Sequence, residues 1–138
     1  MKSLFIIPLV LMSLVSSPSW ALSIDDLVIR AGLYYEKFTA TPFTGELDEG
    51  QHRGSIKNGK KEGSWVIYHD NGQLQSKGNY KNGDRVGFRE EYWPNGQLHA
   101  KGNHENGRQE GYWEWYNEDG TVIKWLAGTY KNGMKVSQ

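Results

Sequence analysis

Apolar and polar residues alternate along the chain from residue 54 onward, and Asn-Gly or Asp-Gly pairs interrupt the alternation at regular intervals. A period of two is typical of β-strands, and these pairs are typical of hairpin turns. The turn signals lie about 10 to 13 residues apart, which leaves roughly six to nine residues for each strand. The pattern predicts an all-β fold, an antiparallel meander of stacked β-hairpins that forms one elongated sheet.

The same segment also repeats itself. Residues 54–77 and 78–101 are identical at eleven aligned positions, among them Lys-Asn-Gly at 57–59 and 81–83 and Asn-Gly-Gln-Leu at 71–74 and 95–98. A third unit starts at Gly102 and reaches its next glycine at Gly128, two residues later than in the first units, and a half unit follows. Two extra residues preserve the alternation of a strand. Because an isolated hairpin is marginally stable, we expect each unit to bury its face against the next.

The turn sequences set the expected register. Each has glycine in third place, as in Asp-Asn-Gly at 70–72 and Lys-Asn-Gly at 57–59, which predicts three-residue loops with a left-handed glycine. Such loops pair Tyr68 with Leu74 and Val66 with Ser76, and in the later units they pair Tyr92 with Leu98 and Tyr116 with Val122. One face then carries a ladder of tyrosines that includes Tyr80 and Tyr130. The opposite face carries tryptophans and charged residues, with Trp115 and Trp125 as neighbours on adjacent strands: Trp65, Ile67, Lys77, Arg89, Glu91, Trp93, Lys101, Trp113, Trp115 and Trp125.

Two sets of glycines recur inside the predicted strands, at 54, 78, 102 and 128 and at 63, 87 and 111. Glycine weakens a strand unless its position requires a missing side chain or a special backbone conformation. The periodic return therefore predicts two uses, room for an aromatic ring across the backbone and a bend of the sheet at a fixed place in every unit.

The first 21 residues differ from the rest. They contain a basic Lys2, an apolar run over residues 4–15 and a small-residue end at Ser19-Trp20-Ala21, the pattern of a cleaved signal peptide. The run is shorter than the roughly 20 residues that span a bilayer. We expect a periplasmic or secreted protein with three parts: a signal peptide at 1–21, an N-terminal cap with a degenerate first repeat at 22–53, and three repeats plus a partial fourth at 54–138.

Composition narrows the function classes. The chain has 16 basic and 16 acidic residues, so it has no overall attraction for nucleic acid, and we expect no nucleic-acid partner. There is no cysteine, which excludes disulfides and a lipid-modified N-terminus. No Gly-x-Ser-x-Gly or His-Glu-x-x-His motif occurs, and His99 and His104 point to opposite faces of a strand. We expect neither an enzyme, nor a metal site, nor a cofactor.

The repeated pattern resembles the MORN repeat, the membrane occupation and recognition nexus, in its bacterial variant form. The resemblance rests on Gly-x-x-x-x-Tyr-x-x-Asn-Gly-x-Leu followed by Gly-x-Tyr-Lys-Asn-Gly-x-x-x-Gly and covers residues 54–133, while Pro42-Phe43-Thr44-Gly45 is similar to a degenerate opening repeat. It implies a curved single sheet that serves as a scaffold for protein contacts, with lipid binding also proposed for relatives. Many bacterial relatives are labelled antitoxin components, but an exported protein is a poor neutraliser of a cytoplasmic toxin. Arg89 departs from the pattern, since the other units have tryptophan there.

The tryptophan row is the sharpest functional feature. We expect a non-enzymatic scaffold that binds an envelope or secreted protein through Trp65, Arg89, Trp113, Trp115 and Trp125. The alternatives are a carbohydrate-binding module for envelope glycans and association with a membrane surface. A purely structural use, with the rings shielding strand glycines, also stays open. So does pairing of the last sheet edge, 131–138, with another copy.

Overall fold

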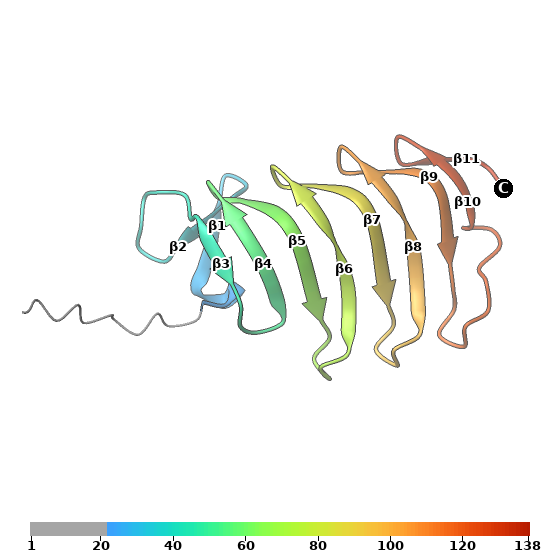
Figure 1. Ribbon diagram of the computed structural model, residues 1–138, viewed down its shortest axis with the longest axis horizontal. Coiled ribbons are helices and arrows are strands. Elements are labelled where there is room, and N and C mark those ends of the chain that lie inside the picture. The colour runs from blue at the N-terminus through green and yellow to red at the C-terminus, as the bar shows by residue number, and fades with distance from the viewer. Residues whose placement is uncertain (1–21) are drawn as a thin grey trace, which may run out of the picture.

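The computed structural model describes residues 22–138, and the predicted signal peptide lies outside the described residues (Figure 1). A short 3₁₀ turn, η1 (Ile24–Asp26), precedes eleven strands: β1 (Leu27–Arg30), β2 (Leu33–Glu36), β3 (Gly45–Leu47), β4 (His52–Lys57), β5 (Lys60–Tyr68), β6 (Leu74–Lys81), β7 (Asp84–Tyr92), β8 (Leu98–Glu105), β9 (Arg108–Trp115), β10 (Gly128–Lys131) and β11 (Met134–Ser137). Strands β3 to β11 form one nine-stranded antiparallel sheet in sequence order, and β1 pairs with β2. The predicted meander of stacked hairpins is confirmed (Figure 1).

The hairpins close with two kinds of turn. The tip at 70–72 is a three-residue loop, as predicted, because the His69 amide donates to Gln73 and the Gly72 amide donates back to His69. The prediction is wrong for Lys-Asn-Gly, since Lys57 pairs directly with Lys60 around two loop residues. Asn58 and Gly59 both have positive φ, +49° and +79°, which is the type I′ geometry that matches the twist of the strands.

Backbone hydrogen bonds also join neighbouring hairpins at their tips. The Gly83 amide donates to the carbonyl of Lys61, and the Gly107 amide donates to that of Arg85. At the opposite tips the Asn71 and Asn95 side chains donate to carbonyls one repeat later, at Pro94 and Glu118. Each repeat is therefore held by the next at both ends, as the repetition predicts.

One bulged residue corrects the predicted register. Tyr68 pairs with Leu74 as expected, but Ile67, not Val66, pairs with Ser76, because Gln75 is an extra residue on β6. The third unit has the predicted Tyr116–Val122 bridge. Lys77 and Lys101 consequently lie on the face opposite Trp65, and Tyr80 lies on the same face as Trp65, both contrary to prediction.

The recurrent glycines serve both predicted uses. Gly63, Gly87 and Gly111 have φ near +70° (+70°, +68° and +77°), with open space where a Cβ would stand, so they are required for their backbone conformation. The strands bow in every repeat (Figure 1). At Gly54 and Gly102 the space is filled instead, because a Cβ would come within 2.6 Å and 2.3 Å of a tryptophan ring.

The N-terminal segment covers one end of the sheet. Ser23 and Asp26 form a capping box on η1. Leu27 and Phe43 then pack in one buried cluster with Leu47, Ile56, Trp65 and Tyr80. The Gly59 amide donates to the carbonyl of Phe43, which ties the cap to the first two-residue turn.

The third unit uses its two extra residues in a turn. The amides of Leu126 and Ala127 both donate to the Ile123 carbonyl, and pairing resumes at Gly128 opposite Trp113. Gly128 therefore pairs with Trp113 as Gly78 pairs with Trp65. Trp125 lies in this turn, 73% exposed, and is not the predicted strand neighbour of Trp115.

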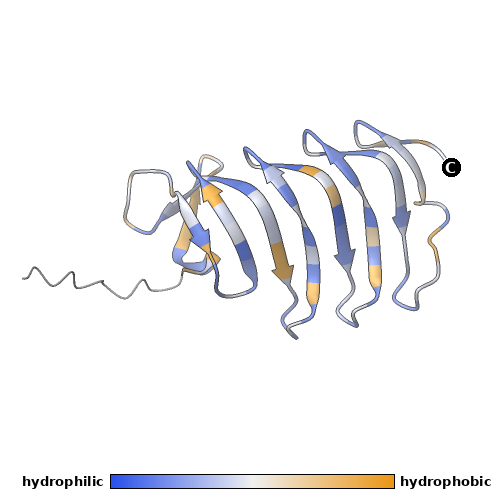
Figure 2. Cartoon of the chain, in the orientation of Figure 1, coloured by the Kyte–Doolittle hydropathy of each residue, from blue (hydrophilic) through white to orange (hydrophobic). Residues whose placement is uncertain are grey.

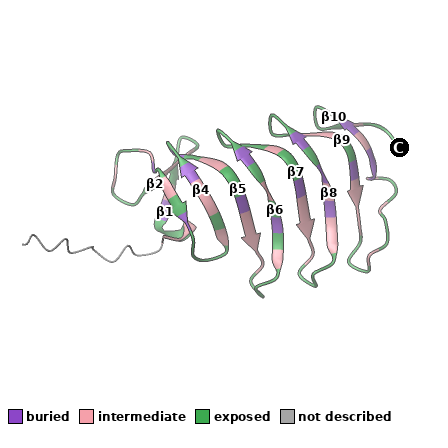
Figure 3. Cartoon of the chain, viewed as in Figure 1, coloured by how far each residue is buried: buried purple, intermediate pink, exposed green. Residues whose placement is uncertain are grey.

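The core is small and divided between repeats. Hydrophobic stretches on the strands are short and interrupted (Figure 2), in agreement with a mean hydropathy of −0.71. Buried positions recur in the middle of the strands, while most hairpin tips are exposed (Figure 3). Two clusters result, one around Trp65 and one around Trp113, Ala100 and Tyr130.

Two candidate binding faces of the repeat sheet

The sheet has an inner face, which we define by three rows of side chains that cross the strands. The first row contains Ile56, Lys61, Tyr80, Arg85, His104, Gln109 and Tyr130. The middle row alternates glycine with a large side chain: Gly54, Trp65, Gly78, Arg89, Gly102, Trp113 and Gly128. The third row contains His52, Ile67, Ser76, Glu91, Ala100 and Trp115.

Trp65 and Trp113 fill the middle row. Each is only 1% exposed and lies across a glycine. Each indole Nε1 donates to a backbone carbonyl, that of Ser55 at 3.0 Å and that of Asn103 at 2.9 Å. Their position and bonding support the structural use of these rings, because a partner does not reach them in this fold.

Arg89 occupies the tryptophan position of the middle repeat and is 5% exposed. Its Nε donates to Glu91 at 2.7 Å and its second guanidinium nitrogen donates to the Ser76 hydroxyl at 2.9 Å. Gly78 therefore faces a flexible side chain where the flanking repeats present a ring, and a Cβ on Gly78 would lie 3.2 Å from Arg89 Cγ. The repeat between the two apolar clusters of the core thus has a partly buried ion pair at this position.

Positive charge gathers in the first row. The Lys61 ammonium lies 4.3 Å from the centroid of the Trp65 ring and 5.2 Å from that of Tyr80. Burial lowers the pKa of Lys61, and the charges of Arg89 and Arg85 lower it further despite the opposing effect of Tyr80. Burial, together with the charges of Arg85 and Arg89, lowers the pKa of His104 to about 4. His104 is therefore neutral at pH 7.

The third row ends in an aromatic chain. The His99 ring lies 4.0 Å from Trp93 and 5.6 Å from Trp115, and Trp115 stacks on Trp113 at 5.7 Å between ring centroids. His99 therefore lies on the same face as His104, which packs on Trp113, contrary to prediction. Beside it is a hollow of about 510 Å³ whose lining includes Arg89, Glu91 and Trp93. Trp115 is half-buried, so it is accessible only in part.

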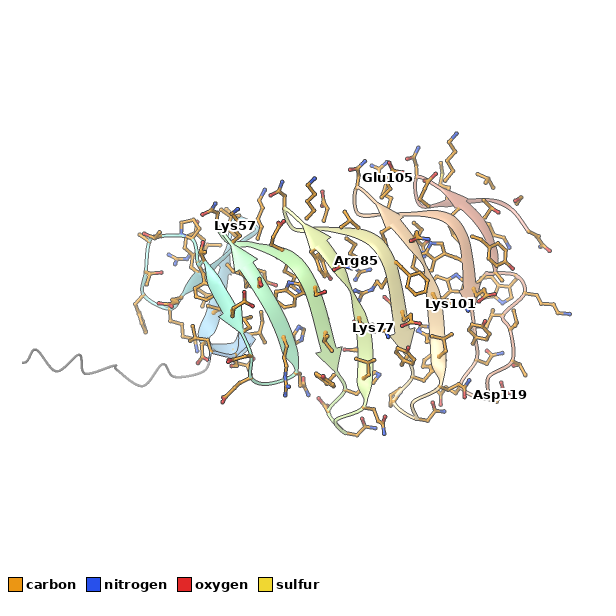
Figure 4. All side chains as sticks on the ribbon, in the orientation of Figure 1. Lys57, Lys77, Arg85, Lys101, Glu105 and Asp119 are labelled. Carbon is orange, nitrogen blue, oxygen red and sulfur yellow. The ribbon has the colours of Figure 1, made fainter. Side chains whose placement is uncertain are left out.

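The outer face carries paired charges and exposed aromatics. Lys77 pairs with Glu90 and Lys101 with Glu114, each at 2.8 Å, and the two lysines hold equivalent places in successive repeats (Figure 4). The carboxylate partner of each lysine raises its pKa. Phe88 and Tyr112 stand at one repeat position and are 50% and 58% exposed. Phe88 lines two shallow hollows, of about 320 and 270 Å³, on either side of itself.

The five residues predicted from the sequence to bind a partner do not form one exposed surface. Trp65, Arg89 and Trp113 are buried in one row, Trp115 lies beside them, and Trp125 stands apart in an exposed turn. Sequence reasoning missed Lys61 and Arg85, which share a repeat position 24 residues apart. It also missed Phe88 and Tyr112. These two aromatic residues share a repeat position as well, and this shared position could have revealed them.

Within residues 22–138, no three His, Asp or Glu side chains gather as metal ligands do. Over the same residues, no helix has the length and apolarity to cross a membrane.

Comparison with known families matches two segments of this sheet. Residues 61–82 and 86–106 each match the MORN repeat variant, and these segments are the hairpins β5–β6 and β7–β8 with their Asn-Gly turns. None of the curated proteins matches the chain. The matches lie one repeat apart and share the glycine pattern that bends the strands. Two of the repeats, the hairpins β5–β6 and β7–β8, therefore match the MORN repeat of the variant type.

Proposed function

We propose that this chain is a non-enzymatic scaffold that acts after export and binds an envelope or secreted protein through the outer face of its repeat sheet. MORN repeats form scaffolds for protein or membrane interaction, which supports the general part of this proposal. The finer part is carried by one observation, the pair Phe88 and Tyr112. Two large aromatic side chains stand half-exposed at the same position of successive repeats, and such rings are enriched at protein interfaces.

The surroundings of this pair favour a protein partner with an apolar contact strip. The hollows beside Phe88 are shallow, and the flanking lysines and glutamates already neutralise one another. A partner therefore gains little from new ion pairs, and we expect its affinity to depend weakly on salt.

Affinity capture from an envelope extract with matched variants tests the proposal. A protein captured by the wild type should be lost with Phe88→Ala plus Tyr112→Ala and retained with Phe38→Ala, which removes a fully exposed ring elsewhere. Equal capture by all three proteins contradicts the outer-face proposal. Mass spectrometry of the mature protein tests export: a chain that starts at Leu22 supports it, and an intact N-terminus contradicts it.

A carbohydrate partner is the second candidate. It is supported by the hollow where Trp93 and His99 adjoin the polar side chains of Arg89 and Glu91, since sugars bind to aromatic faces flanked by polar groups. Envelope glycan fragments should then change tryptophan fluorescence in the wild type but not in Trp93→Ala. Absence of a saturable change with the wild type contradicts this candidate. Membrane-surface association is the third, and the balanced charge argues against it.

A further inference from the structure

A second hollow on the inner face lies between the N-terminal cap and the first two repeats. It measures about 550 Å³, and its lining includes Tyr34 from the cap, Lys61 from β5, Tyr80 from β6 and Arg85 from β7. The position of Arg85 is shown in Figure 4. Side chains from four elements thus surround one space that is open to solvent on the face opposite Phe88 and Tyr112.

The cations of this hollow have no acidic partner. Among the described residues, neither Lys61 nor Arg85 has a carboxylate oxygen within 4.0 Å. Asp84 lines the turn end of the hollow without pairing with either of them, and Lys60 adds a further positive charge there. Glu91 is held by Arg89. The hollow therefore keeps an uncompensated positive charge, in contrast with the outer face, where Lys77 and Lys101 each hold a glutamate.

The positive charge of the hollow affects the neighbouring side chains of the first row. Burial by itself raises the pKa of the Tyr80 phenol, but a hydrogen bond from Arg85 and the charges of Lys61 and Arg89 outweigh burial and lower it. His104, the next side chain of the row, is 7% exposed, and its Nδ1 has no hydrogen-bond partner. The buried Nδ1 of His52, in the third row, also has no hydrogen-bond partner. Among the charged side chains that line the hollow, Lys60, Lys61 and Arg85 are cationic and Asp84 is the one anion, so positive charge predominates there.

We propose that this hollow binds a soluble oxyanion, a carboxylate or phosphate group, between Lys61 and Arg85. An ammonium and a guanidinium make strong charge-assisted hydrogen bonds to such oxygens. The two cations repel each other in the empty hollow, and an anion between them removes that repulsion. The site is on the face opposite the proposed protein contact, so it does not depend on that function.

Titration with two probes, sodium phosphate and sodium citrate, tests the proposal. In low-salt buffer the full protein should bind at least one of them with a dissociation constant on the order of 1 mM or tighter. Because Lys61 lies on the Trp65 ring, binding should change tryptophan fluorescence, and the ring signals of His104 should shift in NMR spectra. A response to citrate alone identifies a carboxylate site, and a response to phosphate alone identifies a phosphate site.

Charge-matched variants decide where the anion binds. Lys61→Gln and Arg85→Gln should each weaken binding by about tenfold or more, while Lys57→Gln and Arg108→Gln, at exposed strand ends beside turns, should leave it unchanged. Arg85→Lys keeps the charge and should bind more tightly than Arg85→Gln, which separates a fold defect from a lost contact. Two results overturn the proposal: no saturable response to either probe, or equal weakening by the turn variants.

Discussion

Replacing Gly102 by alanine should destabilise the protein through one steric contact. A Cβ on Gly102 would lie 2.3 Å from Cδ2 and 2.4 Å from Cε2 of Trp113, well inside ordinary van der Waals contact. The ring has no room to retreat, because it is 1% exposed, its Nε1 is bonded to the Asn103 carbonyl, and Trp115 stacks on it. Either the ring is expelled or the strands separate.

The magnitude follows from these two outcomes. Overpacking of a well-filled core costs about 1 to 3 kcal/mol. Full loss of a buried tryptophan costs about 3 to 5 kcal/mol, which is the upper bound. We expect about 3 kcal/mol for Gly102→Ala, a large part of the roughly 5 to 15 kcal/mol that stabilises a typical domain.

The middle repeat supplies the matched control. A Cβ on Gly78 would lie 3.2 Å from Arg89 Cγ, on a side chain that can yield by a few tenths of an ångström. Gly78→Ala should therefore lower the free energy of unfolding by less than about 1 kcal/mol. The lower entropy of the unfolded chain with alanine offsets part of the steric cost.

Urea denaturation of both variants measures the difference. The midpoint of Gly102→Ala should fall well below that of Gly78→Ala, with similar m-values. In a Trp113→Leu background the additional cost of Gly102→Ala should nearly vanish, because the clashing ring is gone. Equal midpoints for the two glycine variants, or an unchanged cost without the indole, would refute the reasoning.

Three further changes probe other parts of the sheet. Between about pH 6.5 and 4 the unfolded chain protonates His104 while the folded chain does not, so the free energy of unfolding should fall as the pH is lowered, by up to about 3 kcal/mol. The urea midpoint should change less across this range in His104→Gln than in the wild type. Equal pH dependence of the two proteins would contradict the lowered pKa of His104. Arg89→Ala leaves Glu91 and Ser76 without their partner and should cost about 2 to 3 kcal/mol in thermal unfolding; a neutral effect would show that the ion pair is dispensable. Asn82 has φ +49° in a two-residue turn, so Asn82→Ala should cost about 1 kcal/mol and Asn82→Gly much less by urea denaturation; equal costs would contradict the turn geometry.

The repeat made the architecture predictable, because each unit carries its own turns and glycines in phase. Tyr68–Leu74 and Tyr92–Leu98 pair as the loop lengths predict. The two turn types were harder to distinguish, since both contain Asn-Gly. In Asp-Asn-Gly the Asn71 side chain accepts a hydrogen bond from the Gln73 amide, whereas in Lys-Asn-Gly the asparagine itself takes a left-handed φ. That choice depends on how the flanking strands pair, which the local sequence does not state.

The candidate sites were less predictable, because one bulged residue in each repeat decides which face a side chain occupies. The extra residue Gln75 moves Lys77 to the outer face, where it meets Glu90, and brings Tyr80 beside Trp65. Without the bulge, the inner face would carry the lysines of both repeats and the outer face the tyrosines. A register error of one residue therefore leaves the predicted fold correct, but it assigns buried side chains to the binding surface and exposed side chains to the core.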